Sequence, residues 1–146
     1  MSRSFYLGSD HGALDLKNQL VSYIQTSYPN FEVLDLGTHS TESVDYPDIA
    51  GALSEKVLSS NGIGILCCGT GIGMSLKANR YKGIRAALVY DTHTATLCKE
   101  HNNANVLVLG SRVTNKKNAL KITKIFFKTK FLKGRHLRRV KKFKNV

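Results

Sequence analysis

The residues best suited to chemistry form the run Cys68-Gly69-Thr70-Gly71-Ile72-Gly73, which separates an apolar stretch from an amphipathic one. Glycines allow a tight turn, and the N–H groups at the start of the following helix favour anions and developing negative charge. A thiol at a helix N-terminus has a lowered pKa, so its thiolate can act as a nucleophile or a base near neutral pH. The run therefore predicts an oxyanion cradle with Cys68 at its edge.

Other interpretations of this loop fit the sequence less well. A dinucleotide fingerprint needs glycine where Met74 stands, and a cysteine phosphatase loop needs arginine at that same position. The alternative role for Cys68 is a buried structural thiol, which is how most free cysteines occur. Adjacent residues of a strand point to opposite faces, so we expect Cys67 in the core while Cys68 meets the loop. Cys98 is expected to be structural.

Two further polar pairs lie near the ends of predicted elements. Asp10 and His11 follow a strand and can supply an acid–base carboxylate and an imidazole that faces phosphate. Alternatively, Asp10 caps a helix and His11 faces solvent. His101 and Asn102 lie where a helix ends, so His101 is either a general acid or only a complement to the helix C-terminus. Nothing in the sequence brings His101 near Cys68.

Positive charge is concentrated in the last third of the chain. Of 22 Lys and Arg residues, 14 lie within residues 101–146, where there is no Asp or Glu. Such a basic segment indicates nucleic acid, a membrane surface or a phosphorylated ligand, although a solvated lysine-rich helix explains it equally. Arg135 and Arg139 are four residues apart and share a helix face, where two guanidinium groups suit a phosphate monoester.

Short apolar runs alternate with helix-length amphipathic segments along the chain. The expected strands are residues 5–7, 31–36, 63–68, 84–90 and 105–109; the expected helices are 14–24, 47–58, after 73 to about 80, 92–101 and 115–128. Five βα units in series predict an α/β fold, a three-layer α/β/α Rossmann-like sandwich with a five-stranded parallel sheet. Ligands of such sheets bind at the carboxyl ends of the strands.

Length and composition restrict the class of protein. The 146 residues suit a single domain, expected over 1–128, with a basic C-terminal extension over 129–146. No stretch is long and apolar enough to cross a membrane. Three cysteines make no disulfide framework, and the N-terminus lacks a signal-peptide pattern, so we expect a cytoplasmic protein. No histidine pair has metal-ligand spacing, so no metal site is predicted.

Taken together, several ordered motifs resemble the type B ribose-5-phosphate isomerase family, which also includes isomerases of galactose and allose phosphates. The resemblance covers the chain from Leu7 to about Val140. The motifs that carry it are Gly8-x-Asp10-His11, Asp45-Tyr46-Pro47, Cys68-Gly69-Thr70-Gly71-Ile72-Gly73, Ala78-Asn79, Gly83-Ile84-Arg85-Ala86, His101-Asn102-x-x-Asn105-Val106, Gly110-Ser111-Arg112 and Gly134-Arg135-His136.

The resemblance implies an isomerase of aldose and ketose phosphates that uses no metal or organic cofactor. It implies a homodimer, or a dimer of dimers, whose active sites are built from both subunits. By motif, Cys68 would be the base and Asp10 would contact sugar hydroxyls. The remaining implied roles are ring opening by His101 with Thr70, enediolate binding by Gly69, Gly71, Ile72 and Gly73, sugar positioning by Asn102, and phosphate binding by His11, Arg135, Arg139 and, more weakly, Arg112.

The function expected from this resemblance is interconversion of D-ribose 5-phosphate and D-ribulose 5-phosphate through ring opening and a cis-enediol. A six-carbon phosphate isomerase acting on allose or galactose 6-phosphate stays open, as does a protein that only binds sugar phosphate or nucleic acid. The chain departs from the family at Asn103, where an acidic residue is common, and in its lysine-rich tail. No membrane partner is expected, and the tail leaves a nucleic-acid partner open.

Overall fold

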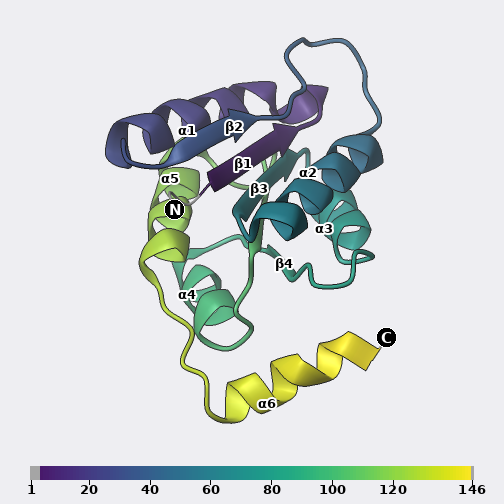
Figure 1. Cartoon of the computed structure of the whole chain (residues 1–146). Helices are drawn as coiled ribbons and strands as arrows, with labels where there is room; N and C mark the ends of the chain where they lie inside the picture. Colours follow the sequence, from purple (N-terminus) through teal and green to yellow (C-terminus); the bar gives the residue numbers. More distant parts are fainter. Residues whose placement is uncertain (1–3, 146) are drawn as a thin grey trace.

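A computed structural model of the chain describes residues 4–145, so Val146 of the predicted extension lies outside the described part (Figure 1). Its centre is one sheet of five strands, all pairs parallel, in the order β2-β1-β3-β5-β4. The strands are β1 (Ser4–Ser9), β2 (Glu32–Asp35), β3 (Ile63–Cys68), β4 (Ala86–Leu88) and β5 (Val106–Gly110). The predicted parallel sheet is confirmed.

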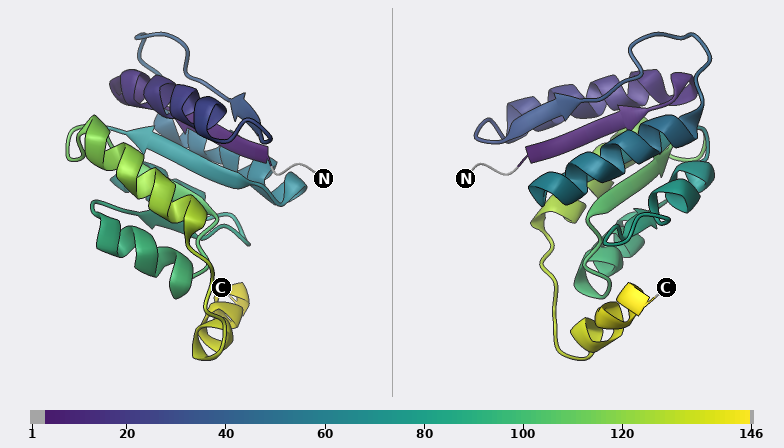
Figure 2. Two further views of the ribbon diagram at one scale, coloured as in Figure 1. Left: turned by 90° about the vertical axis from the view of Figure 1, so that its left-hand side faces the viewer. Right: turned by 45° about the vertical axis from the view of Figure 1, so that its right-hand side comes forward.

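Helices cover both faces of the sheet and complete the predicted three-layer sandwich (Figure 2). One face carries α1 (Leu14–Ser27), α4 (Thr92–Glu100) and α5 (Lys116–Lys128), and the other carries α2 (Tyr46–Ser60) and α3 (Ile72–Ala78). Each helix buries an apolar stripe of helical period, which is the main source of its stability in a fold of this size.

The two faces of β3 belong to two separate cores. Every residue of β3 is buried, as expected of a central parallel strand covered on both sides. Ile63, Ile65 and Cys67 pack with α1, α4 and α5, whereas Leu66 and Cys68 pack with α2 and α3. The prediction that Cys67 and Cys68 face opposite ways is confirmed.

The fourth strand is shorter than predicted. The apolar pattern suggested 84–90, but β4 spans only Ala86–Leu88 and pairs only with β5 at the sheet edge. At its start, the side chain of Asn105 accepts the Arg85 N–H (2.8 Å) and that of Asn79 accepts the Ala86 N–H (2.8 Å). These amide side chains occupy the backbone donors at the amino end of β4, so the strand begins later than residue 84.

After α5 the chain leaves the sandwich. Residues 129–134 lead to a short helix, α6 (Arg135–Lys141), followed by one 3₁₀ turn, η2 (Lys142–Asn145). Figure 1 places α6 beyond the β4 side of the sheet, away from the arrowheads of β1 and β3. The Leu132 N–H donates to the Glu100 carbonyl (3.1 Å), which ties this connection to the end of α4. Within the described chain, none of the helices is long and apolar enough to span a bilayer.

Candidate active site

The carboxyl ends of β1, β3 and β5 meet at one edge of the sheet and bring the first group of predicted site residues together. Cys68 pairs in register with Gly110, and Ser9 pairs with Cys67. The Asp10 N–H donates to the Cys67 carbonyl (3.2 Å), and the Ser111 N–H donates to that of Cys68 (2.9 Å). Because the chain moves from β1 outward to β2 and then back to β3, this edge is the switch point at which such sheets bind ligands.

The thiol of Cys68 lies under the glycine loop. The Gly71 N–H donates to its Sγ atom at 3.1 Å, and only 5% of the residue is exposed. The glycine loop therefore brings a backbone donor directly onto this sulfur. Cys67, by contrast, is fully enclosed in the opposite core, where burial raises the pKa of its thiol far above the ordinary value. The geometry therefore supports a chemical role for Cys68 and a structural one for Cys67.

Cys98 is the third free cysteine; it is a residue of α4 and is buried in the core between this helix and the sheet. Its thiol donates to the Ala95 carbonyl (3.2 Å), and burial raises its pKa to about 11. A thiol held protonated by its surroundings packs as a small apolar side chain. These observations agree with the structural role predicted for it.

The loop after Cys68 is closely packed and turns sharply into α3. Gly71 has a φ of +83°, and a β-carbon there would lie 2.5 Å from Leu88 Cδ1. At Gly73 a β-carbon would lie 2.4 Å from the ring of Tyr46. The Thr70 hydroxyl accepts the Ile72 N–H (3.3 Å). The next N–H groups of α3 have no helical acceptor, since they belong to its first turn, and they stay available to an anion.

Asp10 does not cap a helix, contrary to one interpretation of the sequence. Its side chain makes no capping hydrogen bond to the 3₁₀ turn η1 (His11–Ala13). Its Oδ1 atom is buried and has no hydrogen-bond partner among the described residues. A buried carboxylate oxygen without a donor is costly unless a ligand supplies one. The unpartnered oxygen makes Asp10 a candidate to accept a hydrogen bond from a ligand.

His11 and Arg112 line one cavity of about 420 Å³ next to this edge, together with the N-terminal ends of α1 and α5. The exposed His11 accepts the Val44 N–H at Nδ1 (3.2 Å), which leaves Nε2 as its donor. The Arg112 guanidinium lies over Gly69, 3.3 Å from where a β-carbon would stand. An imidazole and a guanidinium that share a cavity suit a phosphate group, which makes Arg112 a stronger candidate than the sequence indicated.

The second group of predicted residues lies elsewhere on the chain. His101 caps the C-terminal end of α4, and residues 101–105 lead into the amino end of β5. Cys68 pairs with Gly110 at the opposite end of β5, about 13 Å further along the strand at ordinary strand rise. In one chain, Cys68 therefore lies at the carboxyl ends of the strands and His101 near their amino ends.

α6 adds to this second group. The His136 ring stacks on that of His101, with centroids 4.2 Å apart and planes 6° from parallel. Burial, followed by the nearby charges of His101, Arg135 and Arg139, lowers the pKa of His136. Both arginines are exposed, as is Asn102. His101, Asn102, Arg135 and Arg139 are thereby collected in one basic cluster, separate from Cys68.

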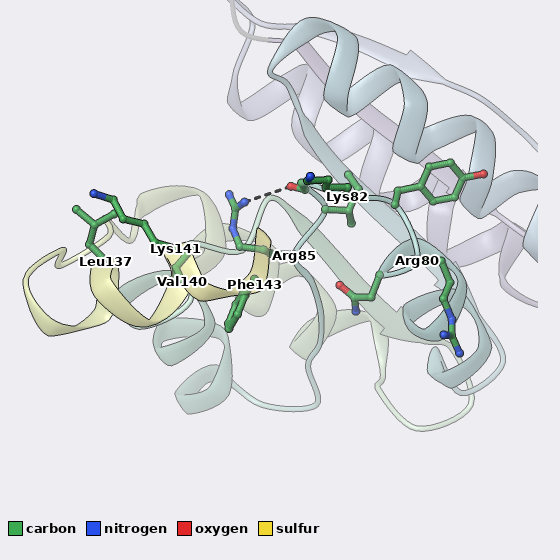
Figure 3. Close-up of a pocket in the computed structure, with 11 residues that line it drawn as sticks. Arg80, Lys82, Arg85, Leu137, Val140, Lys141 and Phe143 are labelled. Carbon is green, nitrogen blue, oxygen red and sulfur yellow. Dashed lines mark hydrogen bonds between the residues drawn. The ribbon is translucent and has the colours of Figure 1, made fainter. Parts of the chain in front are cut away.

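A groove of about 510 Å³ separates α6 and η2 from the loop before β4 (Figure 3). Leu137, Val140 and Phe143 line it from the C-terminal side, and Arg80, Tyr81 and Arg85 from the other.

The Arg85 guanidinium donates hydrogen bonds to the carbonyls of Gly83 and Asn103. Asn103 has a φ of +48°, a conformation that asparagine tolerates. Across residues 4–145 there is no group of three metal-ligating side chains.

Two features of the structure have no role predicted from the sequence. His136 was part of a motif, but its stacking on His101 joins residues that are 35 positions apart and follows only from the path of the chain after α5. Lys17 is completely buried and paired with Asp35. A signal for Lys17 was present, because it lies between Leu14 and Leu20 on the apolar stripe of α1.

Comparisons with known proteins agree with this arrangement. A family model described as Ribose/Galactose Isomerase matches residues 5–143. Ribose-5-phosphate isomerase B of Escherichia coli is 38% identical over 134 residues, covering 91% of this chain and 89% of that protein. A solved ribose 5-phosphate isomerase of Thermotoga maritima is 45% identical, with a TM-score of 0.94 and full coverage of both chains.

A second solved structure is similar to the chain over almost its whole length. The type B ribose 5-phosphate isomerase of Trypanosoma brucei is 40% identical, has a TM-score of 0.94, and is matched over 99% of this chain and 98% of that one. The family model and both solved structures span the sheet, the Cys68 loop and α6. This chain belongs to the ribose/galactose isomerase family of sugar-phosphate isomerases.

Proposed function

We propose that the protein is a ribose-5-phosphate isomerase, converting D-ribose 5-phosphate to D-ribulose 5-phosphate. The observation that carries the proposal is the Cys68 thiol, which receives the Gly71 N–H beside the unpartnered carboxylate oxygen of Asp10. A base and a hydrogen-bond acceptor at one edge suit proton transfer next to a carbonyl. Relatives that match the chain nearly end to end are named for this reaction.

In the proposed mechanism His101, with Thr70, first moves the protons that open the furanose ring to the free aldehyde. The Cys68 thiolate then removes the proton from C2, and the electron pair shifts to make a cis-enediolate with negative charge on O1. N–H groups of residues 69–73 stabilise that charge, as preorganised donors do in other proton abstractions. Cys68 returns the proton to C1, while the O2 hydroxyl proton is transferred to O1 with Asp10 accepting a hydrogen bond.

The phosphate would be held by His11 and Arg112 at the Cys68 edge and by Arg135 and Arg139 from the extension at 129–146. Guanidinium groups bind phosphate oxygens in pairs, which fixes the end of the substrate opposite its reacting carbons. The described arginines of α6 are exposed and lie beyond the sheet, so in one chain they do not reach the His11 cavity.

We therefore infer a homodimer in which each site combines the Cys68 edge of one subunit with the His101 cluster of the other. The α3 surface next to the Cys68 loop supports it, since Ile72 and Leu76 are 50% and 61% exposed. These side chains are four residues apart and form an apolar face of the kind that marks an interface. A dimer of dimers is compatible with the same arrangement.

The three free cysteines favour a reducing, cytoplasmic compartment.

Turnover of three sugar phosphates tests the proposal. The purified full chain is assayed for ketose formation from ribose 5-phosphate, and in parallel for isomerisation of allose 6-phosphate and galactose 6-phosphate, in EDTA without added cofactor. We expect turnover of the pentose. Turnover of a hexose phosphate alone would keep the mechanism and overturn the substrate. No turnover of any of the three by a folded dimer would contradict the proposed function.

A further inference from the structure

The most deeply buried charge of the described chain lies close to the Cys68 edge and has no part in the mechanism above. Lys17, on the first turns of α1, has no exposed surface. Its ammonium donates to both carboxylate oxygens of Asp35 and to the Thr38 carbonyl, each at 2.7 Å. An ammonium has three N–H groups, so these acceptors use all of them.

The acceptors of Lys17 belong to the segment that leaves β2. Asp35 is the last residue of that strand, and its Oδ1 atom also accepts the Gly37 N–H (2.9 Å). His39 approaches the other side of the Asp35 carboxylate, with Nδ1 at 3.8 Å from Oδ2. Asp35 and Lys17 thus hold the first turn of the connection that runs over residues 36–45.

This turn is bonded directly to the residue before Asp10. The Ser9 N–H donates to the Gly37 carbonyl (2.7 Å), and the Thr38 N–H donates to the Ser9 carbonyl (2.8 Å). Both backbone groups of Ser9 are therefore hydrogen-bonded to the segment that Lys17 and Asp35 hold. On its other side, the Asp10 N–H is bound to β3 through the Cys67 carbonyl (3.2 Å).

The far end of the same connection contacts His11, the second candidate ligand-binding residue that follows β1. The Val44 N–H donates to Nδ1 of His11 (3.2 Å). Residues 36–45 thus touch the backbone before Asp10 at one end and the His11 ring at the other. Any displacement of this connection would move a catalytic carboxylate and a phosphate-binding imidazole together.

Stability alone does not account for a charge at this place. A buried ion pair costs much desolvation energy, and well-packed apolar residues often replace one without loss of stability. We propose that Lys17 is a positioning residue: with Asp35, it fixes the 36–45 connection so that Asp10 and His11 meet the substrate in one geometry. This inference rests on the proposed isomerase function.

Three variants test the role of Lys17. Lys17→Met keeps the volume and removes the charge, and Asp35→Asn keeps the shape and weakens the pair. Leu20→Ala, one turn along α1, is the matched control, because it opens a cavity in the same core without touching the network. The readouts are kcat and KM for ribose 5-phosphate and the hydrogen exchange of the Ser9 and Thr38 amides, all well below each melting temperature.

We expect both network variants to lower kcat about 10- to 100-fold, with a smaller change in KM, because displaced reacting groups slow the chemical step more than binding. The two amides should exchange at least about tenfold faster, since local opening sets their protection. Leu20→Ala should keep kcat within about threefold and leave these amides protected. Should Lys17→Met fail to fold, Asp35→Asn carries the same expectations.

The inference would be overturned if folded Lys17→Met or Asp35→Asn kept the wild-type kcat and the wild-type hydrogen-exchange protection of the Ser9 and Thr38 amides. An equal loss in Leu20→Ala would also overturn it, because the effect would then follow general destabilisation. Failure of the proposed function looks different: the wild-type chain itself would turn over no sugar phosphate. In that case exchange of the Ser9 and Thr38 amides alone decides whether Lys17 fixes the connection, and unchanged protection refutes it.

Discussion

Cys67 and Cys68 are neighbours in the chain with opposite chemical surroundings. Strand alternation places Cys67 among apolar side chains, where burial keeps its pKa high. Cys68 receives a backbone N–H from the glycine loop. The pair provides an internal comparison between a thiol that packs in the core and the thiol proposed to act as the base.

Cys68→Ala is expected to lower kcat on ribose 5-phosphate by about 10²- to 10⁴-fold, the usual loss when a general base is removed. Cys67→Ala should retain most of the activity, because its side chain faces the other core. Steady-state kinetics and thermal melts of both variants check this. Full turnover by a folded Cys68→Ala would exclude Cys68 as the base.

The lowered pKa of His136 predicts an acid-sensitive fold. Burial among His101, Arg135 and Arg139 favours the neutral imidazole in the folded chain. Below a pH of about 6.5, the unfolded chain binds that proton more readily, so stability is lost as the pH falls. His136→Gln should therefore reduce the drop in melting temperature between about pH 7.5 and 5.5. The exposed His93→Gln is the control, and an equal effect of both would refute the role of His136.

At the scale of elements, the turn between β3 and α3 determines where the Cys68 loop can lie. Gly71 has a φ of +83°, and a β-carbon built on it would lie 2.5 Å from Leu88 Cδ1 and 3.3 Å from the Leu109 carbonyl oxygen. A side chain there meets both backbone strain and a clash. Gly134, before α6, also has a positive φ of 53°, but nothing lies within 4 Å of its β-carbon position.

Comparing these two glycines separates strain from packing. Gly134 has a φ of 53° and a ψ of −128°, a conformation that glycine adopts far more readily than residues with a side chain. With nothing near its β-carbon position, Gly134→Ala should cost backbone strain alone, about 1–3 kcal/mol. Gly71→Ala should exceed that by at least about 1 kcal/mol, because extra atoms must displace well-packed neighbours. It should also lower kcat, since the loop over Cys68 moves. Urea unfolding measures both losses, and equal values would contradict the close packing of the loop.

The whole molecule divides its candidate site into two parts. The Cys68 edge lies at the carboxyl ends of the strands, whereas the His101 cluster lies at the amino end of β5 and on α6. In a two-fold symmetric dimer each part of one subunit can face the other part of its partner. If each site is shared as proposed, activity requires the dimer.

Mixing two inactive variants tests this condition. Cys68→Ala and His101→Ala homodimers should each be inactive, yet after subunit exchange the mixed dimer holds one intact site. Random reassortment at equal amounts should restore about a quarter of wild-type activity, provided two-fold symmetry closes the assembly.

Leu76→Glu, on the exposed face of α3, should shift the protein to monomers in sedimentation and abolish turnover. Activity of such a monomer would contradict the shared site.

By itself, the sequence determined the succession of strands and helices, the turn at Gly71 and the opposite orientation of Cys67 and Cys68. These features depend on local periodicity and on residues whose backbone preferences are strong. The motifs also predicted the family. Local rules also indicated that Arg135 and Arg139 share a helix face, as they do on α6.

Only the tertiary structure decided which residues meet. Strand order, and with it the contact of Asp10 with the Cys68 strand, comes from pairing between segments far apart in the chain. The separation of His101 from Cys68 follows from α4 running antiparallel to the strands. The buried Lys17–Asp35 pair and the stack of His136 on His101 likewise join distant positions. Such contacts depend on how whole elements pack, which no local pattern specifies.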